Sequence, residues 1–488
     1  MQPYTSSTSV LTRALVRSII TNLEALPTVR RMAESREIRG SVGAVARLTH
    51  TYVLKGRLHP MMNGRALRRL ALAACAAALV VTGLTPGAQA TPGPAPSRTL
   101  GSGTRFYVDP HSEAAHQALS DLRAGHLADA RNMAELASWP EAVWLTDGTP
   151  QQVGDRVRGI VQAAKATRSV PLLVLYDVPG RDCGSYSAGG AADSAAYDAW
   201  VKAVARAIGT YKAVVIVEPD SLALLPKDCG PDTDPTGSLT TARIAEVRSA
   251  VGTLEADPAT SVYLDAGNSK WQPVGEITGR LIDAGLRQAQ GFALNISNYQ
   301  PTDQLNRYGT WVSKCVWYAT ESLDPAGRAD QCASQYYSSA APNDGLPGDA
   351  VEFDDPSTWH WTDAWYDSNV GTPRTDRLTH YVLDTSRNGR GAWTAPPGKY
   401  TDDEPWCNAP GRGVGNRPTT QTGAPLADAY LYVKTIGQSD GTCHRGTAGP
   451  GDPEYGGVED PPAGAWWPDF AHTLAGNANP PLTFNHAR

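Results

Sequence analysis

The stretch from Val214 to Leu222 has the sequence V-V-I-V-E-P-D-S-L. Its first four residues are β-branched, which is the composition of a strand buried on both faces of a parallel sheet. Pro219 lacks a backbone donor and cannot continue a central strand. Glu218 and Asp220 therefore lie where a buried strand ends. Burial there would raise a carboxyl pKa into the range of a usable acid, although a helix cap or a structural ion pair explains the pattern equally well.

The composition narrows the possible function classes. The chain has 488 residues and a formal net charge of -6, so it carries no basic field that would favour a nucleic acid partner. It contains 13 Trp and 19 Tyr but only 5 Phe. Trp and Tyr suit surfaces that stack on a polar ligand such as a sugar, or the edge of a large core.

Residues 61–90 have the parts of a secretory signal peptide. Three arginines precede an apolar run over 70–84, and Ala88-Gln89-Ala90 forms the cleavage site. The run is too short to span a bilayer securely. We expect a secreted, extracellular protein that is monomeric and free of the membrane after cleavage. The expected organisation is an over-long start at 1–60, the signal at 61–90, a Pro/Gly-rich lead at 91–102 and one domain over 103–488.

The number of cysteines is consistent with export to an oxidising compartment. Six remain after the signal peptide, which are Cys183, Cys229, Cys315, Cys332, Cys407 and Cys443. An even number in a secreted chain implies disulfides, and six cysteines allow fifteen pairings. No two of them form a C-x-x-C pair, so no metal site is expected.

From residue 105 onward, strand and helix patterns alternate. The expected strands cover 106–108, 142–145, 171–176, 213–217, 261–265, 291–295, 379–384 and 429–433. About eight strands interleaved with helices predict a parallel sheet, either closed into a barrel or doubly wound. Polar residues follow nearly every strand, and a barrel brings all of these loops to one face. We therefore predict an α/β fold, a distorted TIM-like barrel of seven to eight strands.

Two segments are long for loops of such a barrel, namely 300–377 and 400–425. Long loops in a compact domain are usually functional covers. The first contains Cys315 and Cys332, whose short separation suits a staple within the loop. It also contains five tryptophans, which either line a covered tunnel or pack the loop itself: Trp311, Trp317, Trp359, Trp361 and Trp365.

A second carboxylate stretch runs from Val174 to Gly190, V-L-Y-D-V-P-G-R-D-C-G-S-Y-S-A-G-G. A buried strand ends at Tyr176, and Asp182 follows after a Pro-Gly turn. Pairing with Arg181 would lower the pKa of Asp182, whereas a second carboxylate nearby would raise it. A Cys183–Cys229 bridge would hold the loops of Asp182 and Asp220 side by side. Two carboxylates in one cleft can separate their pKa values and leave one protonated as an acid.

These two stretches resemble the signature motifs of glycoside hydrolase family 6, the inverting cellulases. The motifs are Y-x-x-P-x-R-D-C and a hydrophobic strand ending E-P-D-S/A-L, and both are matched without gaps. Further matches are L-D-A-G at 264–267, N-I-S-N-Y at 295–299, D-T-S-R-N-G at 384–389, W-C-N at 406–408 and S-D-G at 439–441. The resemblance covers the chain from about residue 105 to its end. It implies a seven-stranded distorted barrel.

The resemblance also implies roles for individual residues. Asp220 would be the general acid, Asp182 would raise the pKa of that acid, and Tyr176 would distort the sugar ring. Asp440 would be the candidate base, acting on water directly or through other waters. Trp144, Trp271 and Trp406 would be sugar platforms, and Asn295, Asn298, Lys434 and Gln438 would also bind the substrate. Cys407 would pair with Cys443. The expected substrate is cellulose or another β-1,4-glucan chain, and the expected reaction needs no metal or cofactor.

Gln438 departs from the family pattern, which usually has Glu at this position. A neutral side chain there reduces the negative charge beside Lys434 and Asp440. We expect weaker binding of sugar hydroxyls or a lower pKa of Asp440. This departure keeps open an alternative of another class, a carbohydrate-binding protein with weakened catalysis.

The long stapled loops favour a cellobiohydrolase that cuts cellobiose from chain ends. The alternative within the family is an endoglucanase with an open cleft. Three acidic residues are expected to hold loops rather than to react: Glu218 through backbone bonds, Asp265 as a loop organiser, and Asp384 by pairing with Arg387 or capping a turn.

Overall fold

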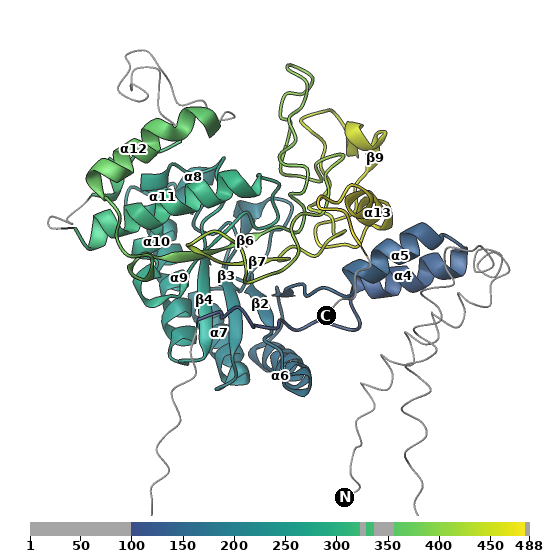
Figure 1. Ribbon diagram of the computed structural model, residues 1–488, viewed down its shortest axis with the longest axis horizontal. Helices are drawn as coiled ribbons and strands as arrows, with labels where there is room; N and C mark the ends of the chain where they lie inside the picture. The colour runs from purple at the N-terminus through teal and green to yellow at the C-terminus, as the bar shows by residue number, and fades with distance from the viewer. Residues whose placement is uncertain (1–98, 323–327, 336–355, 484–488) are drawn as a thin grey trace, which may run out of the picture. The chain divides into compact units, whose positions relative to one another are not determined.

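The computed structural model describes residues 99–322, 328–335 and 356–483. Its central element is a parallel sheet whose seven strands pair in the order of the sequence (Figure 1). The strands are β1 (Val143–Leu145), β2 (Leu172–Leu175), β3 (Ala213–Val217), β4 (Thr260–Asp265), β5 (Gly291–Leu294), β6 (His380–Asp384) and β7 (Ala427–Leu431). Because each strand pairs with the next one in the sequence, the sheet curls into a barrel-like layer, which confirms the predicted fold class.

Helices connect the strands and cover the outside of the sheet, except for two helices that precede the first strand and one that follows the last and that pack together (Figure 1). They are α4 (Glu113–Ala124), α5 (Leu127–Leu136), α6 (Pro150–Thr167), α7 (Ser194–Ile208), α8 (Pro226–Cys229), α9 (Ser238–Glu255), α10 (Val274–Asp283), α11 (Thr302–Thr320), α12 (His360–Asn369) and α13 (Pro468–Gly476). A short antiparallel pair, β8 (Gly451–Asp452) and β9 (Val458–Glu459), lies before α13. α6 begins with a capping box in which Thr149 and Gln152 satisfy each other's backbone N–H groups, and Asp193 caps α7.

The strands are apolar on both faces because each face meets a different core. In β3, Val214 and Ile216 join an inner cluster with residues of the other strands, including Val174 and Val382. Their neighbours Val215 and Val217 join an outer cluster formed with the helices. Side chains alternate between the faces of a strand, so one run of β-branched residues fills both cores.

The barrel is not closed by a continuous ladder. Between β1 and β7, a single parallel bridge joins Glu141 to Tyr432, and the Ala142 N–H donates to the Tyr432 carbonyl at 2.9 Å. The prediction of a strand at 106–108 is wrong, because Phe106 forms only an isolated bridge with Val170. The main sheet of the described residues therefore has seven strands, as the family resemblance implied.

The expectation of a long loop over 300–377 is wrong for most of its described part. α11 and α12 occupy much of it, and Trp311 and Trp359 are buried in the outer core with ring centroids 5.1 Å apart. Trp311 also donates to Asp363 of α12. Trp317, Trp361 and Trp365 are partly buried against the same core. These tryptophans pack the outer layer, and residues 323–327 and 336–355 lie outside the described part.

The three expected disulfides form, joining Cys183 to Cys229, Cys315 to Cys332 and Cys407 to Cys443. The segment 400–425 lacks helices and strands, in agreement with the expected long loop.

The predicted signal peptide and the residues before it lie outside the described part. Within the described part, no helix is both long enough and apolar enough to cross a membrane.

Glu218 fixes the loop after β2 to the loop after β3. Its fully buried carboxylate accepts hydrogen bonds from the Asp177 and Val178 N–H groups, each at 3.1 Å, and from the Tyr197 hydroxyl at 2.9 Å. This confirms the expectation that Glu218 holds the loop. Because these donors are buried away from water, they depend on the Glu218 carboxylate as their hydrogen-bond acceptor.

We predict that Glu218→Ala lowers the free energy of unfolding by about 3 kcal/mol, because buried donors lose a charged acceptor. Tyr197→Phe removes one donor only and should cost about 1 kcal/mol. Urea unfolding followed by circular dichroism measures both. Glu459→Ala, at an exposed position, is the control and should change stability by less than about 0.5 kcal/mol. A Glu218→Ala protein as stable as the control would contradict the assignment.

Candidate active site

The residues that the sequence singled out gather at the carboxyl ends of the strands. Trp144 belongs to β1, Tyr176 and Asp182 follow β2, Asp220 follows β3, Asp265 ends β4, Asn295 and Asn298 follow β5, Asp384 ends β6, and Lys434, Gln438 and Asp440 follow β7. Parallel strands in a curled sheet bring these ends to one face. The predicted gathering of polar loops on one face is therefore confirmed.

Asp220 is held by its backbone while its carboxylate stays unengaged. Its N–H donates to Asp265 Oδ2 at 2.9 Å, and its φ of 68° lies in the left-handed region that few side chains adopt. Among the described residues, no group donates a hydrogen bond to the Asp220 carboxylate. Burial raises the pKa of Asp220 well above its usual value, and the charges of Asp265 and Asp182 raise it further.

Asp182 lies on the loop after β2, close enough to influence Asp220. Its Oδ2 accepts the Ser187 N–H at 2.7 Å, and burial raises its pKa despite this bond and the charge of Arg181. Arg181 does not form an ion pair with Asp182. Its guanidinium donates to the carbonyls of Thr146 and Tyr176 and lies 4.8 Å from the centre of the Tyr176 ring.

Asp440 has the opposite electrostatic environment. Arg387 Nη1 lies 2.9 Å from its Oδ2, and Lys434 Nζ lies 3.1 Å from its Oδ1. The Asn408 N–H at 2.9 Å and the Tyr299 hydroxyl at 3.3 Å also donate to Oδ2. Although burial alone would raise the pKa of Asp440, Arg387 and Lys434 hold it below its usual value. Asp440 is thus a carboxylate that stays ionised.

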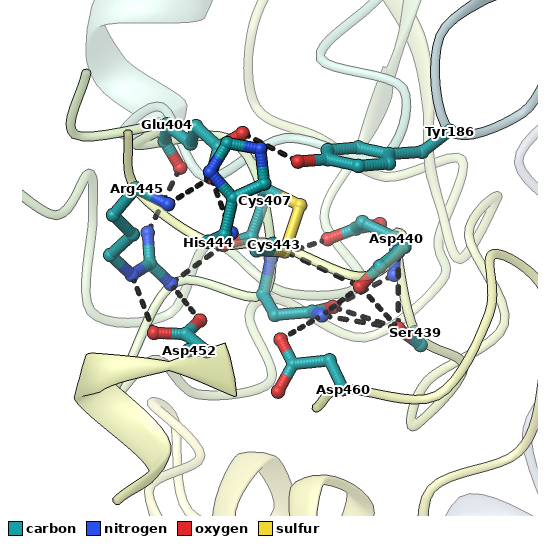
Figure 2. Close-up of a disulfide and its surroundings, with 12 residues drawn as sticks. Tyr186, Glu404, Cys407, Ser439, Asp440, Cys443, His444, Arg445, Asp452 and Asp460 are labelled. Atoms are coloured by element: carbon teal, nitrogen blue, oxygen red, sulfur yellow. Dashed lines mark hydrogen bonds and ion pairs between the residues drawn. A yellow bond between two sulfur atoms is a disulfide. The ribbon is translucent and has the colours of Figure 1, made fainter. Parts of the chain in front are cut away.

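Figure 2 shows the surroundings of the Cys407–Cys443 disulfide, which brackets Asp440. Asn408 exchanges hydrogen bonds with Asp440, since its N–H donates to the carboxylate and its Oδ1 accepts the Asp440 N–H at 2.7 Å. On the other side, its amide donates to Asp460 at 2.8 Å. Asn408 therefore fixes both the backbone and the side chain of Asp440.

Tyr186 links the loop of Asp182 to the segment around this disulfide (Figure 2). Its hydroxyl donates to Glu404 Oε1 at 2.7 Å, and Glu404 Oε2 accepts the N–H groups of His444 and Arg445. A Cβ atom at Gly441 would come within 2.5 Å of Tyr186, so only glycine allows this approach. The loops after β2 and β7 are in direct contact as a result.

The three predicted aromatic platforms differ in exposure. Trp406 is 40% exposed, with its ring 5.9 Å from Tyr186. Trp144 is partly buried, donates from Nε1 to the Val433 carbonyl at 2.8 Å, and meets the Tyr176 ring edge-on at 5.4 Å. Trp271 is partly buried and packs against the tight turn at Gly267.

The polar residues that were predicted to bind the substrate divide into two groups, buried and partly exposed. Asn295 is fully buried, and its side-chain amide bonds the Asp384 carbonyl and the Gln300 N–H, so the structure places it behind the surface as a loop anchor. Asn298 and Gln438 are partly exposed. Lys434 is occupied by Asp440 and by the Ser439 carbonyl at 3.2 Å.

Asp265 and Asp384 organise loops, as expected. Asp265 Oδ2 accepts the N–H groups of Asp220 and Gly267, and burial raises the pKa of Asp265 to about 7. Asp384 accepts four backbone N–H groups, those of Ser297, Ser386, Val433 and Lys434. Its expected pairing with Arg387 is replaced by the capping of turns, because Arg387 pairs with Asp440.

Three residues with a clear part in the site were not predicted in it. Arg387, Tyr299 and Asn408 all contact Asp440, and the Arg387 guanidinium lies 4.5 Å from the centre of the Tyr299 ring. Each lies within a motif that was matched in the sequence. A lone arginine beside an aspartate in D-T-S-R-N-G points to a local pair, whereas the fold brings Arg387 to a carboxylate 53 residues further along the chain.

One group of described residues has the spacing of metal ligands, namely Cys443, Asp452 and Asp460. The Cys443 sulfur is engaged in the disulfide with Cys407. Asp452 forms a bidentate pair with the buried guanidinium of Arg445 at 2.8 and 2.9 Å. Of the three, only Asp460 keeps a carboxylate oxygen without a hydrogen-bond partner among the described residues, and one such oxygen does not make a metal site.

The site therefore combines a carboxyl group whose pKa is raised with a carboxylate whose pKa is lowered. Asp220 supplies the first and Asp440 the second, and the charge of Asp440 also raises the pKa of Asp220. Such a pair can donate a proton to a leaving group and accept one from water. Aromatic rings nearby provide flat surfaces for a polar ring-shaped ligand.

Comparison with known proteins agrees with this chemistry. Endoglucanase A of Thermobispora bispora is 31% identical over 421 residues, which cover 85% of this chain and 70% of the relative. A probable 1,4-beta-D-glucan cellobiohydrolase C of Aspergillus niger is 28% identical over 418 residues, covering 78% of this chain and 77% of that protein.

Among solved structures, the endoglucanase Cel6 of Mycobacterium tuberculosis, in complex with methyl-cellobiosyl-4-deoxy-4-thio-beta-D-cellobioside, has a TM-score of 0.55 and 34% identity. The match covers 77% of this chain and 98% of that structure. The family model for glycosyl hydrolases family 6 matches residues 101–478. The chain therefore belongs to glycosyl hydrolases family 6, and it is a glycoside hydrolase of the cellulase type.

Proposed function

We propose that this protein hydrolyses β-1,4-glucosidic bonds in cellulose with inversion at the anomeric carbon. One observation carries the proposal, the opposite environments of Asp220 and Asp440 within one site. An inverting hydrolase needs a protonated acid at the leaving oxygen and an ionised base that acts through water on the other side of the sugar. The 1,4-beta-D-glucan in the name of the Aspergillus niger relative and the cellobioside bound by the Mycobacterium tuberculosis endoglucanase support the choice of substrate.

Asp220 is the proposed acid. Its protonated carboxyl group gives a proton to the glycosidic oxygen as the bond to the anomeric carbon breaks. The absence of a hydrogen bond to this carboxyl from the described residues leaves it available to the substrate. Burial and the charges of Asp265 and Asp182 raise the pKa of Asp220 and so favour its protonated form. Asp182 also stabilises the positive charge that develops on the sugar.

Asp440 is the proposed base for the attacking water. Its ion pairs with Arg387 and Lys434 keep it ionised but also make it a weak base. This supports action through an ordered water rather than direct abstraction of a proton. Tyr176 contacts the sugar at the reacting position, next to Trp144. Trp271, Trp406, Asn298, Lys434 and Gln438 are the proposed contacts to the other sugars.

Two modes of action are candidates. Release of cellobiose from chain ends is supported by the contacts of Tyr186 with Glu404 and Gly441, because they join the loop after β2 to the loops after β6 and β7. Internal cleavage is supported by the relatives, since the endoglucanases have the higher identities, 31% and 34% against 28%. The segment 300–377 does not favour the exo mode, because α11 and α12 occupy much of its described part and pack on the outer layer.

We further propose that the protein acts outside the cell as a monomer. The three disulfides support an oxidising compartment. The proposed organisation is a signal peptide at 61–90 and one catalytic domain over 103–488.

We expect Asp220→Asn to lower kcat on cellotetraose by about 10²- to 10⁴-fold, because the leaving oxygen loses its acid. On 2,4-dinitrophenyl cellobioside, whose leaving group needs no proton, the loss should be much smaller. Initial rates with both substrates measure the difference. Asp376→Asn, an exposed position paired with Arg374, is the control and should not change either rate. Equal losses on both substrates would rule out the acid role.

The pH profile tests the influence of Asp265. Asp220 must be protonated, so kcat/KM should fall as the pH rises through the raised pKa of Asp220. Burial raises the pKa of Asp265 to about 7, so Asp265 is mostly charged above that pH. Asp265→Asn removes that charge, lowers the pKa of Asp220 and should move the alkaline limb to lower pH. An unmoved limb would show that Asp265 does not control the acid.

Product analysis separates the two modes. An exo enzyme should release nearly pure cellobiose from amorphous cellulose while the viscosity of carboxymethyl cellulose falls slowly. An endo enzyme should lower that viscosity early, before much reducing sugar appears. Viscometry and chromatography on the same reaction measure both. A rapid early fall in viscosity would reject the exo mode.

A further inference from the structure

A cavity of about 350 Å³ lies next to the proposed cleft. Two of its lining residues, Trp144 and Gln438, are among the proposed substrate contacts, while His111, Glu113, Trp139 and Arg156 have had no role so far. Its volume is at the lower end of the range for small-ligand pockets, roughly 300–1,000 Å³. The cavity lies between the start of α4, the first turns of α6 and the loop after β7.

The cavity shares a wall residue, Trp144, with the proposed site. Asp220 influences the pKa of Tyr176, and the Tyr176 ring meets Trp144 edge-on at 5.4 Å. Trp144 in turn forms part of the cavity wall. A glucan chain that lies across Tyr176 and Trp144 therefore reaches the cavity with its next sugar.

The lining suits a neutral sugar. Trp139 and Trp144 provide aromatic surface, and the polar groups around them include both donors and acceptors. Glu113 Oε2 is buried and has no hydrogen-bond partner among the described residues. A buried carboxylate oxygen without a partner is costly, and a sugar hydroxyl would satisfy it.

Charge disfavours an anionic ligand here. Asp109, Glu113 and Glu141 all line the cavity, against one cationic side chain, Arg156. Arg156 lies on the exposed side of α6 and forms no ion pair with a described residue. It is therefore free to donate hydrogen bonds to the hydroxyls of a ligand.

We propose that this cavity is an additional sugar subsite, which binds a glucosyl unit of the substrate beyond Trp144. This rests on the proposed β-1,4-glucan hydrolysis. The subsite adds contacts to the glucan at a distance from the bond that is cleaved. It therefore adds binding energy for long glucan chains that reach it and none for short ones. Arg156 and His111 are its specificity-determining residues, with Glu113 as an acceptor.

The chain-length dependence of hydrolysis tests the subsite. For the wild-type protein, kcat/KM should rise from cellotetraose to cellohexaose by about fivefold, the size of one good polar contact. In the double variant His111→Ala/Arg156→Ala this gain should disappear, while the value for cellotetraose stays within about twofold. Arg158→Ala is the matched control, since Arg158 is on the same helix, pairs with Asp155 and does not line the cavity.

Thr435→Phe blocks the cavity from the opposite wall and should have the same effect as the double variant. Thermal melting confirms that each variant is folded. The dissociation constants of cellohexaose and cellotetraose for Asp220→Asn protein, with and without the cavity substitutions, measure binding apart from turnover. A wild-type protein without a gain for cellohexaose, or a gain that survives both sets of substitutions, would overturn the subsite. A protein that does not cleave cellotetraose at all would instead overturn the proposed function.

Discussion

Backbone N–H groups just beyond the ends of parallel strands need acceptors, and three buried carboxylates supply them. Glu218, after β3, bonds the loop after β2, and Asp265, at the end of β4, bonds the loop after β3. Asp384, at the end of β6, bonds the loops on both sides of it, after β5 and after β7. Each carboxylate thus ties its neighbour's loop to the sheet. The proposed acid and the lysine beside the proposed base both have their backbone fixed in this way.

Burial raises the pKa of both Asp220 and Asp440, and the charged neighbours of each decide the difference. Asp220 is surrounded by Asp182 and Asp265, so its charged form is disfavoured twice. Asp440 is buried against Arg387 and Lys434, so its charged form is favoured despite the loss of water. A single low-dielectric site can hold an acid and a base at the same pH only through such an unequal distribution of charges. The sequence motifs identify the carboxylates, but only the fold shows which cations reach them.

Much of the fold could be predicted because its determinants are local. The strand of β3 follows from four β-branched residues and the proline after them, and the observed bounds of 213–217 agree with the prediction. The helix α11 was missed because its buried face includes polar side chains such as Gln304 and Ser313, which hide the helical pattern. The strand expected at 106–108 failed because a short apolar run at the edge has only one pairing partner.

The site was predictable in part for the same reason. Asp182 and Asp220 lie within long local motifs, whereas the contacts of Arg387 and Asn408 with Asp440 span 53 and 32 residues and depend on packing. The left-handed backbone at Glu218 and Asp220 is also invisible in the sequence, since it is stabilised by the surrounding bonds.

The position of the cystines has a consequence for how the protein matures. Cys183–Cys229 and Cys407–Cys443 join loops beyond the strand ends, and no cystine among the described residues links one strand of the main sheet to another. The strand ladder can therefore assemble before either of these bridges exists. The two bridges instead constrain the loops that bear Asp182 and Asp440. A chain kept in a reducing environment would hold its sheet while its reactive groups lose their mutual alignment.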